Sequence, residues 1–133
     1  MCVEHLVTAA DSARLLRFSP ADEFPDVLAT SRMVALMEVA AARVMHACLG
    51  AGEVSVGVSI NVEHLSATPL FETVRAEALY LGQEGKLHRF EVKLFDRGGL
   101  VGTGTHTRAI VEPQRLLDRA RQRIEAGAPP NDR

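Results

Sequence analysis

An acidic residue interrupts the most apolar segment of the chain. Glu38 lies in the middle of residues 29–45, ATSRMVALMEVAAARVM, which we expect to form a helix buried on nearly all sides. Its helical neighbours three and four positions away carry no charge: Val34, Ala35, Ala41 and Ala42. Proteins keep an acid in such a place where a partner arrives from another element or where catalysis needs it. Glu38 is therefore a candidate catalytic group, and the alternative is that it faces solvent on an incompletely buried helix.

The second candidate is a histidine at the end of a predicted strand. Residues 54–64, VSVGVSINVEH, alternate strictly between apolar and polar side chains, which predicts a strand whose valines face the helix. His64 continues the register of those valines, so we expect it at the rim of the core, where it could meet Glu38. A carboxylate and an imidazole together form an acid–base unit near neutral pH. A histidine with a structural role only is the alternative.

Three further positions carry residue types that suit a functional site. Thr30 or Ser31 fits the N-cap of the central helix, and the Thr30 hydroxyl could instead face a cleft as a nucleophile or hydrogen-bond donor. Gly57 interrupts a valine-rich strand, which indicates close approach by another backbone or a ligand. Arg108 shares one strand face with His106 and either holds an anion or lies in solvent.

The elements that must position these residues follow from periodicity and turn signals. Strands are expected at 2–8, 54–64, 72–82, 87–95 and 100–111, a long loop at 9–29, and helices from about 30 to 49 and from Pro113 onward. This order predicts an α+β protein consistent with the hot-dog fold: an antiparallel sheet wrapped around a long central helix, with a short C-terminal helix. We expect one domain at 1–126, a disordered tail at 127–133, and a dimer that protects the edge strands.

Bulk composition narrows the range of functions. The chain has 133 residues, 47% of them hydrophobic, and a net charge of -2, which fits a single domain with its own core. The lack of a basic block and of tryptophan argues against nucleic acid, and charges within the longest apolar stretch argue against a membrane span. We expect no signal peptide and a cytoplasmic location. Nothing marks Cys48 as an activated nucleophile, and the histidines lack metal-ligand spacing.

Three stretches of the sequence resemble one known family. EFPDVLATSRMVALMEVAAARVM at 23–45, GVSINVEHLSATP at 57–69 and GTGTHTRAIV at 102–111 are similar to the fluoroacetyl-CoA-specific thioesterase family and its hot-dog relatives. The similarity runs from about residue 7 to residue 124. The resemblance implies a homodimer with active sites at the subunit interface, which hydrolyses an acyl-CoA thioester without a metal or an organic cofactor.

The resemblance also implies roles for individual residues. It assigns catalysis to Thr30, Glu38 and His64, active-site contacts to Gly57 and Arg108, and the lid over the acyl pocket to Phe24. The lid departs from the family pattern, because Ala21 and Leu28 stand where the resemblance would place phenylalanines. We therefore expect a small or medium acyl-CoA as substrate, with fluoroacetyl-CoA as one candidate.

The sequence leaves the mechanism and two other functions open. Glu38 could attack the thioester and form a mixed anhydride, or could act with His64 to activate water. Thr30 could position the reacting groups or serve as the nucleophile, with backbone donors at the helix N-terminus for the oxyanion. The alternative functions are an acyl-thioester hydratase or dehydratase, which would release no free thiol, and a non-catalytic acyl-CoA-binding module.

Overall fold

The computed structural model describes residues 2–127, and the predicted tail lies outside them apart from Gly127. The helices are α1 (Thr30–Met45) and α2 (Pro113–Glu125), and the strands are β1 (Cys2–Leu6), β2 (Val54–His64), β3 (Thr73–Glu84), β4 (Leu87–Asp96) and β5 (Gly99–Val111). Short 3-10 turns lie at Ala9–Asp11 and Ala13–Leu16 in the predicted loop, and at His46–Cys48 after α1. The predicted order of elements is confirmed.

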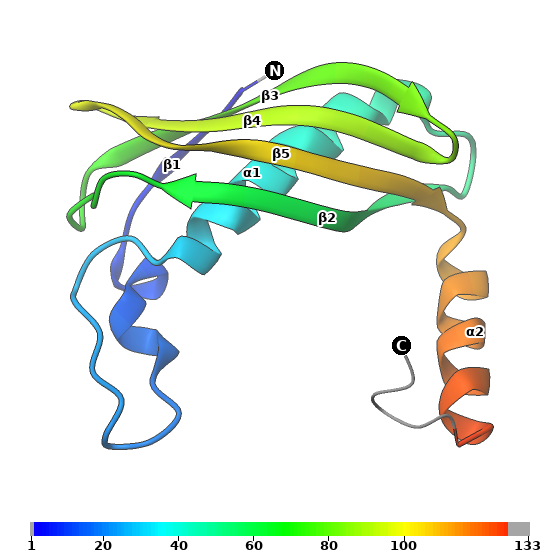
Figure 1. Ribbon diagram of the computed structural model, residues 1–133, viewed down its shortest axis with the longest axis horizontal. Helices are drawn as coiled ribbons and strands as arrows, with labels where there is room; N and C mark the ends of the chain where they lie inside the picture. The colour runs from blue at the N-terminus through cyan, green and yellow to red at the C-terminus, as the bar shows by residue number, and fades with distance from the viewer. Residues whose placement is uncertain (1, 128–133) are drawn as a thin grey trace.

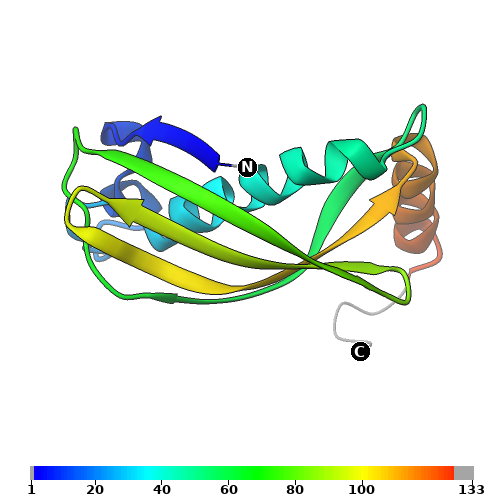
Figure 2. The ribbon, with the colours of Figure 1, turned by 90° about the horizontal axis from the view of Figure 1, so that it is seen from above.

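One antiparallel sheet wraps around the central helix. Its strands lie in the order β1-β3-β4-β5-β2, so β1 and β2 form the two edges. Figures 1 and 2 show α1 running along the concave face of this curved sheet. This arrangement confirms the predicted α+β hot-dog architecture, with α2 as the short C-terminal helix.

The core lies between α1 and the middle strands. The buried helix residues are Met33, Leu36, Met37, Ala40, Ala41 and Met45. The sheet contributes Val74, Ala76 and Ala78 from β3 and Phe90, Val92 and Leu94 from β4, which are alternate residues on one face of each strand. Each large apolar side chain buried in this way stabilises the fold by about 1.5–3 kcal/mol. α1 is thereby held firmly enough to position a site at either of its ends.

A β-bulge in β2 corrects the predicted face of that strand. The pairing of β2 with β5 shifts between Gly57 and Ser59, so Val58 is an extra residue. Strict alternation therefore holds only after the bulge, where Ile60, Val62 and His64 face the core side. Before the bulge the valines face outward, with Val54 42% and Val58 54% exposed. The prediction of a continuous valine face toward the helix is wrong for this half of the strand.

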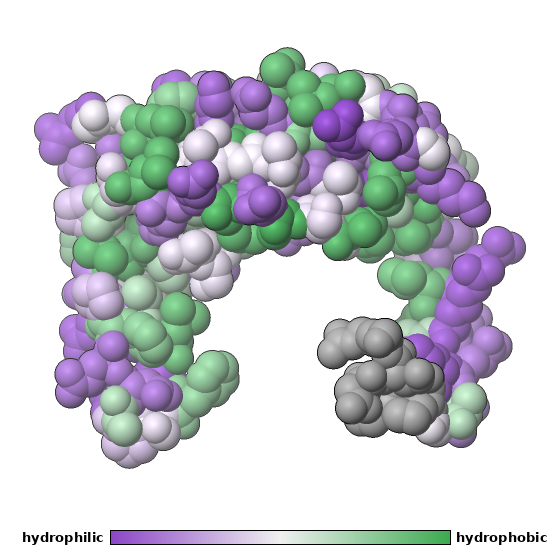
Figure 3. Space-filling model, in the orientation of Figure 1, coloured by the Kyte–Doolittle hydropathy of each residue, from purple (hydrophilic) through white to green (hydrophobic). Residues whose placement is uncertain are grey.

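Two segments project on the same side of the edge strand β2. The N-terminal segment, residues 7–29, lies at one end of the molecule and α2 at the other, with an open space between them (Figure 1). Figure 3 shows hydrophobic side chains along the surfaces that border this space. The large apolar side chains of α2 are solvent-exposed, with Leu116 45%, Leu117 45% and Ile124 66% accessible. No helix among residues 2–127 is long and apolar enough to cross a membrane.

Candidate active site

Thr30 and His64 meet at the start of α1. The Thr30 hydroxyl lies 2.8 Å from Nδ1 of His64, which comes from the end of β2. The predicted cap is wrong, because Ala29 occupies the N-cap position and no side chain caps the helix. The hydroxyl of Thr30 is thus available to the imidazole instead of to the helix backbone. The Arg32 and Met33 amides donate to the Ala29 carbonyl, each at 3.0 Å, so the Thr30 and Ser31 amides are the first-turn donors without an acceptor among residues 2–127, and they project from the N-terminal end of the helix.

A cleft opens in front of this pair. It has a volume of about 460 Å³, and its lining includes Phe24, Leu28, Thr30 and His64. Phe24 is 44% exposed at its rim. Burial is the main cause that lowers the pKa of the His64 imidazole below its ordinary value, with a smaller opposing effect from the Ser66 backbone. His64 is therefore neutral near pH 7, the form that accepts a proton from a hydroxyl.

A buried aspartate ties the N-terminal segment to α1. Asp11 is 1% exposed, and its carboxylate lies 2.8 Å from Nε2 of His5 and accepts from Arg32 Nε at 2.9 Å. Its backbone carbonyl accepts from the Ala29 amide at 2.9 Å, directly before Thr30. Burial opposes the charged carboxylate, but hydrogen bonds from the Thr8 amide, His5 and Arg32 outweigh it and hold the pKa of Asp11 at about 2. This network sets where α1 begins.

Glu38 finds its partner on another strand. Arg108 Nη1 donates to Glu38 Oε1 at 3.2 Å, which accounts for the acid within an apolar helix. The Arg108 side chain is 7% exposed and also donates to the Ser55 hydroxyl and carbonyl, each at 2.9 Å. Arg108 is thus buried and bound to the protein, and the interpretation of this residue as a solvated strand position is wrong. The Glu38 side chain is 41% exposed, so it remains accessible from outside.

Gly57 and His106 complete this second cluster. A Cβ atom on Gly57 would collide with Glu38 Oε1 and would lie 3.3 Å from Cε1 of His106. Gly57 is thus closely approached, but by the Glu38 carboxylate instead of the backbone or ligand that the sequence predicted. His106 Nδ1 lies 2.8 Å from the Ser59 carbonyl, and its Nε2 lies 3.1 Å from Arg108 Nη1. Since the arginine can only donate, His106 is the neutral tautomer with its proton on Nδ1.

One subunit keeps these two clusters apart. Eight residues of helix separate Thr30 from Glu38, about 12 Å along its axis. Seven residues of β2 separate Gly57 from His64, about 20 Å. Among residues 2–127, no hydrogen bond joins Glu38 to Thr30 or His64. The expected contact between Glu38 and His64 therefore does not occur within a single chain. Their separation along α1 and β2 is larger than their side chains can span.

Comparison with known proteins places this geometry in a family. The fluoroacetyl-CoA-specific thioesterase family matches residues 7–114, which include both clusters. The fluoroacetyl-CoA thioesterase of Streptantibioticus cattleyicolor is 40% identical over 105 residues, covering 79% of this chain and 76% of that protein. The chain belongs to the fluoroacetyl-CoA-specific thioesterase family. Membership makes it a thioester hydrolase and disfavours the lyase and binding-module alternatives.

Solved structures of thioesterases have the same fold. A mutant of the fluoroacetyl-CoA-specific thioesterase FlK, crystallised with fluoroacetate and CoA, superimposes with a TM-score of 0.87 at 35% identity. The superposition covers 92% of this chain and 98% of that one. A thioesterase superfamily member from Thermus thermophilus matches with a TM-score of 0.82 at 27% identity, over 94% and 92% of the two chains.

Sequence reasoning missed three residues around the candidate site of this family member. Strict alternation with the valines toward the helix predicts that Ser55 faces away from it, but the bulge at Val58 turns Ser55 toward Arg108. The orienting role of His106 was also missed, although its strand neighbour Arg108 was singled out. Asp11 lies in a segment without periodicity, and its acidic side chain three residues after Thr8 was the one available sign of a capping box.

Proposed function

We propose that this chain hydrolyses a small or medium acyl-CoA thioester to the free acid and CoA, with fluoroacetyl-CoA as one candidate substrate. The observation that carries the proposal is the 2.8 Å contact between the Thr30 hydroxyl and Nδ1 of His64. Both residues line the cleft that also contains Phe24, called the Phe24 cleft below. A hydroxyl held by a neutral imidazole is an activated nucleophile. The name of the relative from Streptantibioticus cattleyicolor supports the substrate class.

The first chemical step uses the Thr30–His64 pair. The Thr30 hydroxyl gives its proton to His64 Nδ1 while its oxygen attacks the thioester carbonyl carbon. The carbon–sulfur bond then breaks, and the leaving thiolate takes the proton from His64 as free CoA. The free amides at the N-terminus of α1 lie close to Thr30 and suit the developing oxyanion. The product of this step is an acyl ester of Thr30, which water must hydrolyse.

The second step requires a base that one subunit does not bring to Thr30. We propose that a homodimer supplies it, through antiparallel pairing of β2 with β2 of a second copy. β2 is an edge strand with one neighbour, and an unpaired edge of eleven residues favours pairing. The exposed apolar residues Val54, Val58, Leu117 and Ile124 lie on the elements that border this edge and fit a buried interface.

Such a dimer would unite the two clusters. With a two-fold axis near Asn61, the bulge at Gly57 of one strand would lie opposite His64 of the other. Glu38 of the partner subunit would then face the Thr30–His64 pair, with Oε1 held by its own Arg108. Its second oxygen would accept a proton from the water that attacks the acyl ester, and would give that proton to the Thr30 oxygen as the ester bond breaks and the free acid leaves. Glu38 as direct nucleophile, or as activator of water without an acyl ester, remains the alternative mechanism.

The proposed reaction needs no metal and no organic cofactor, because water and the three side chains account for every bond and proton. The cytoplasm is the proposed location, supported by the two free cysteines, Cys2 and Cys48. Acyl selectivity is proposed to lie in the Phe24 cleft, where Leu28 lines the wall. The lid at Phe24 has fewer aromatic side chains than the family pattern. It should therefore select acyl groups by their size more strictly than by the presence of fluorine.

A panel of acyl-CoA thioesters tests this function. The purified protein should release free thiol from acetyl-, fluoroacetyl-, phenylacetyl- or hexanoyl-CoA, and a Thr30→Val variant should not. Mass spectrometry of a quenched Glu38→Gln reaction should find the acyl group on the peptide that contains Thr30. An acyl group on Glu38 in the unmodified protein would support the mixed anhydride instead, and no thiol release from any ester would refute the function.

A further inference from the structure

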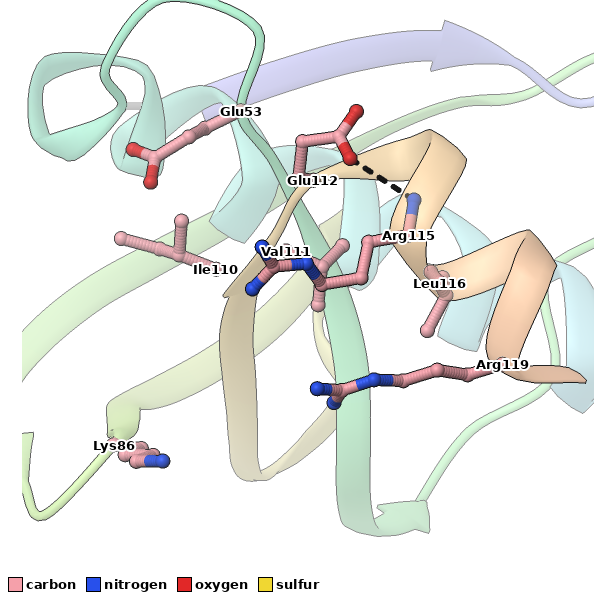
Figure 4. Close-up of a pocket in the computed structure, with 8 residues that line it drawn as sticks. All are labelled: Glu53, Lys86, Ile110, Val111, Glu112, Arg115, Leu116 and Arg119. Atoms are coloured by element: carbon pink, nitrogen blue, oxygen red, sulfur yellow. Dashed lines mark hydrogen bonds between the residues drawn. The ribbon is translucent and has the colours of Figure 1, made fainter.

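A second cleft lies between α2 and the end of the sheet. It has a volume of about 370 Å³, and three cationic side chains line it: Lys86, Arg115 and Arg119. Figure 4 shows Arg115 and Arg119 extending from one face of α2 toward β5, with Lys86 on the β3–β4 hairpin at the far side. Ile110 and Leu116 add apolar surface to its walls. Its lining thus combines positive charge with an apolar surface.

The three cations of this cleft have no carboxylate partners within the part of the chain that the structure describes. Among residues 2–127, none of the ion pairs within 4.0 Å involves Lys86, Arg115 or Arg119. Two acids also line the cleft, but both are engaged with backbone amides. Glu112 accepts from Gln114 and Arg115 amides at the start of α2, and Glu53 accepts from the Gly50 amide at 2.6 Å. The guanidinium and ammonium groups are therefore available to an external anion.

The charge of this cleft differs from that of the whole chain. The protein carries a net charge of -2, whereas α2, PQRLLDRARQRIE, contains four arginines and two acids. An anionic ligand approaching this chain would be attracted mainly where cations gather. Two arginines one helical turn apart, on the same face, can grip a phosphate group with paired N–H donors.

The position of the cleft relates it to the Glu38 cluster. Ile110, which lines the cleft, is the strand partner of Ser55, and Arg108 is the strand partner of Gly57. The Ser55 hydroxyl in turn accepts a hydrogen bond from Arg108. Ile110 is two residues from Arg108 along β5, about 7 Å. Gly57 and the cleft therefore lie at the same end of the β2–β5 pair. An extended ligand whose reacting group lies at Gly57 could place its other end in the cleft.

We propose that the cleft formed by Lys86, Arg115 and Arg119 binds the phosphate-bearing nucleotide end of the CoA thioester. This inference rests on the proposed function for the identity of the substrate. The arginines would contact the phosphates, and Ile110 and Leu116 would cover one face of the adenine base. The acyl group and the nucleotide would thus be recognised at opposite ends of one extended binding path.

The test compares two esters of the same acid, one of CoA and one of N-acetylcysteamine, which lacks the nucleotide. The ratio of their kcat/KM values should fall about tenfold or more in Arg115→Glu/Arg119→Glu, because charge-assisted contacts to phosphate are lost. The matched control is Arg121→Glu, which makes the same charge change on the opposite face of α2 and should leave the ratio unchanged. Lys86→Glu, outside α2, repeats the test if the helix variant does not fold.

Direct binding separates this proposal from the function on which it rests. Adenosine 3′,5′-bisphosphate should bind the unmodified protein in calorimetry and should bind the double variant much more weakly, whether or not any ester is hydrolysed. An unchanged kcat/KM ratio in a protein that hydrolyses CoA esters would overturn the proposal and leave the function intact. Inorganic phosphate binding as tightly as the bisphosphate would also overturn it, since the cleft would then recognise only an anion.

Discussion

The two ends of β2 carry different kinds of chemistry. At the His64 end, two neutral groups lie 2.8 Å apart in an open cleft, and the hydroxyl is placed by the first turn of α1. At the Gly57 end, the Glu38 carboxylate is held by the buried side chain of Arg108, which lies 70 positions later in the sequence. The first end can attack a carbonyl, and the second holds a charge in place. The first end lacks a charged base and the second lacks a nucleophile, and we therefore propose that two subunits share one site.

The Gly57 end also shows how a buried charge is made tolerable. Arg108 has four hydrogen-bonding contacts, to the Ser55 hydroxyl, the Ser55 carbonyl, His106 and Glu38. A buried cation without such contacts would destabilise the fold by several kcal/mol, on the order of 3–5. Burial lowers the pKa of His106, and Arg108 lowers it further, so the imidazole stays neutral and accepts from the arginine. The cluster is thus a rigid holder for one carboxylate.

The largest expected effect comes from removing the base at the His64 end. His64→Ala should lower kcat about a thousandfold, because general-base assistance to the Thr30 hydroxyl is lost. The measurement is thiol release at saturating substrate. His46→Ala removes an exposed imidazole from the turn after α1 and should keep the original rate. Equal losses in both variants would show that the effect is not specific to the site.

A methyl group at the Gly57 end should have the next largest effect. In Gly57→Ala the new Cβ would occupy the place of Glu38 Oε1, so the carboxylate must move. We expect kcat to fall about tenfold to a hundredfold with little change in Tm, since misplacing a catalytic group by about 1 Å costs that much. Adding Glu38→Asp, whose shorter side chain leaves room for the methyl group, should restore part of the rate. No loss in the single variant would remove Glu38 from the mechanism.

The pH profile should distinguish the two imidazoles. Burial lowers the pKa of His64, so its neutral, proton-accepting form persists below the ordinary value of 6.5. The kcat/KM profile should therefore stay level near pH 7 and fall about tenfold per unit on the acid side of that lowered pKa. The same acid limb should remain in His106→Gln. A decline that begins above pH 6.5, or that disappears with His106, would contradict the assignment to His64.

The smallest effect is expected on stability, at Asp11. Asp11→Asn removes the charge that holds His5 and Arg32, and should lower the free energy of unfolding by about 1–3 kcal/mol. Since the folded pKa is about 2 against an ordinary 3.8, the stabilisation is present above pH 4 and is lost as the pH falls toward 2. Urea unfolding of both proteins at pH 7 and pH 2.5 checks this. Asp118→Asn, an exposed control on α2, should unfold like the unmodified protein.

Periodicity predicted the elements well because most of them have one buried face. The bounds of β2 and the start of α2 at Pro113 agree with the expected ones. The resemblance singled out Thr30, Glu38 and Gly57, which the structure distributes between the two clusters. Both the elements and these candidate residues were therefore predicted from local patterns or from quoted motifs.

The errors come from interactions between distant residues. One extra residue at Val58 reverses the face of half a strand, and an alternating sequence carries no sign of it. The N-cap lies at Ala29, because Asp11 fixes the chain before the helix through a backbone contact that no side chain reveals. The separation of Glu38 from His64 follows from helix rise once the strand register is known. The order of the strands, with β2 at an edge, was needed before this separation could be recognised.

Subunit mixing tests the shared site most directly. Glu38→Gln and His64→Ala should each be nearly inactive alone. Equal mixing with subunit exchange should restore roughly a quarter of the original activity, because half of the dimers are mixed and each has one intact site. Mixing Thr30→Val with His64→Ala, which damage the same cluster, should restore nothing. If Glu38→Gln and His64→Ala subunits exchange, as mass spectrometry of the intact dimers would show, and no activity returns, the account of a site built from two subunits is wrong.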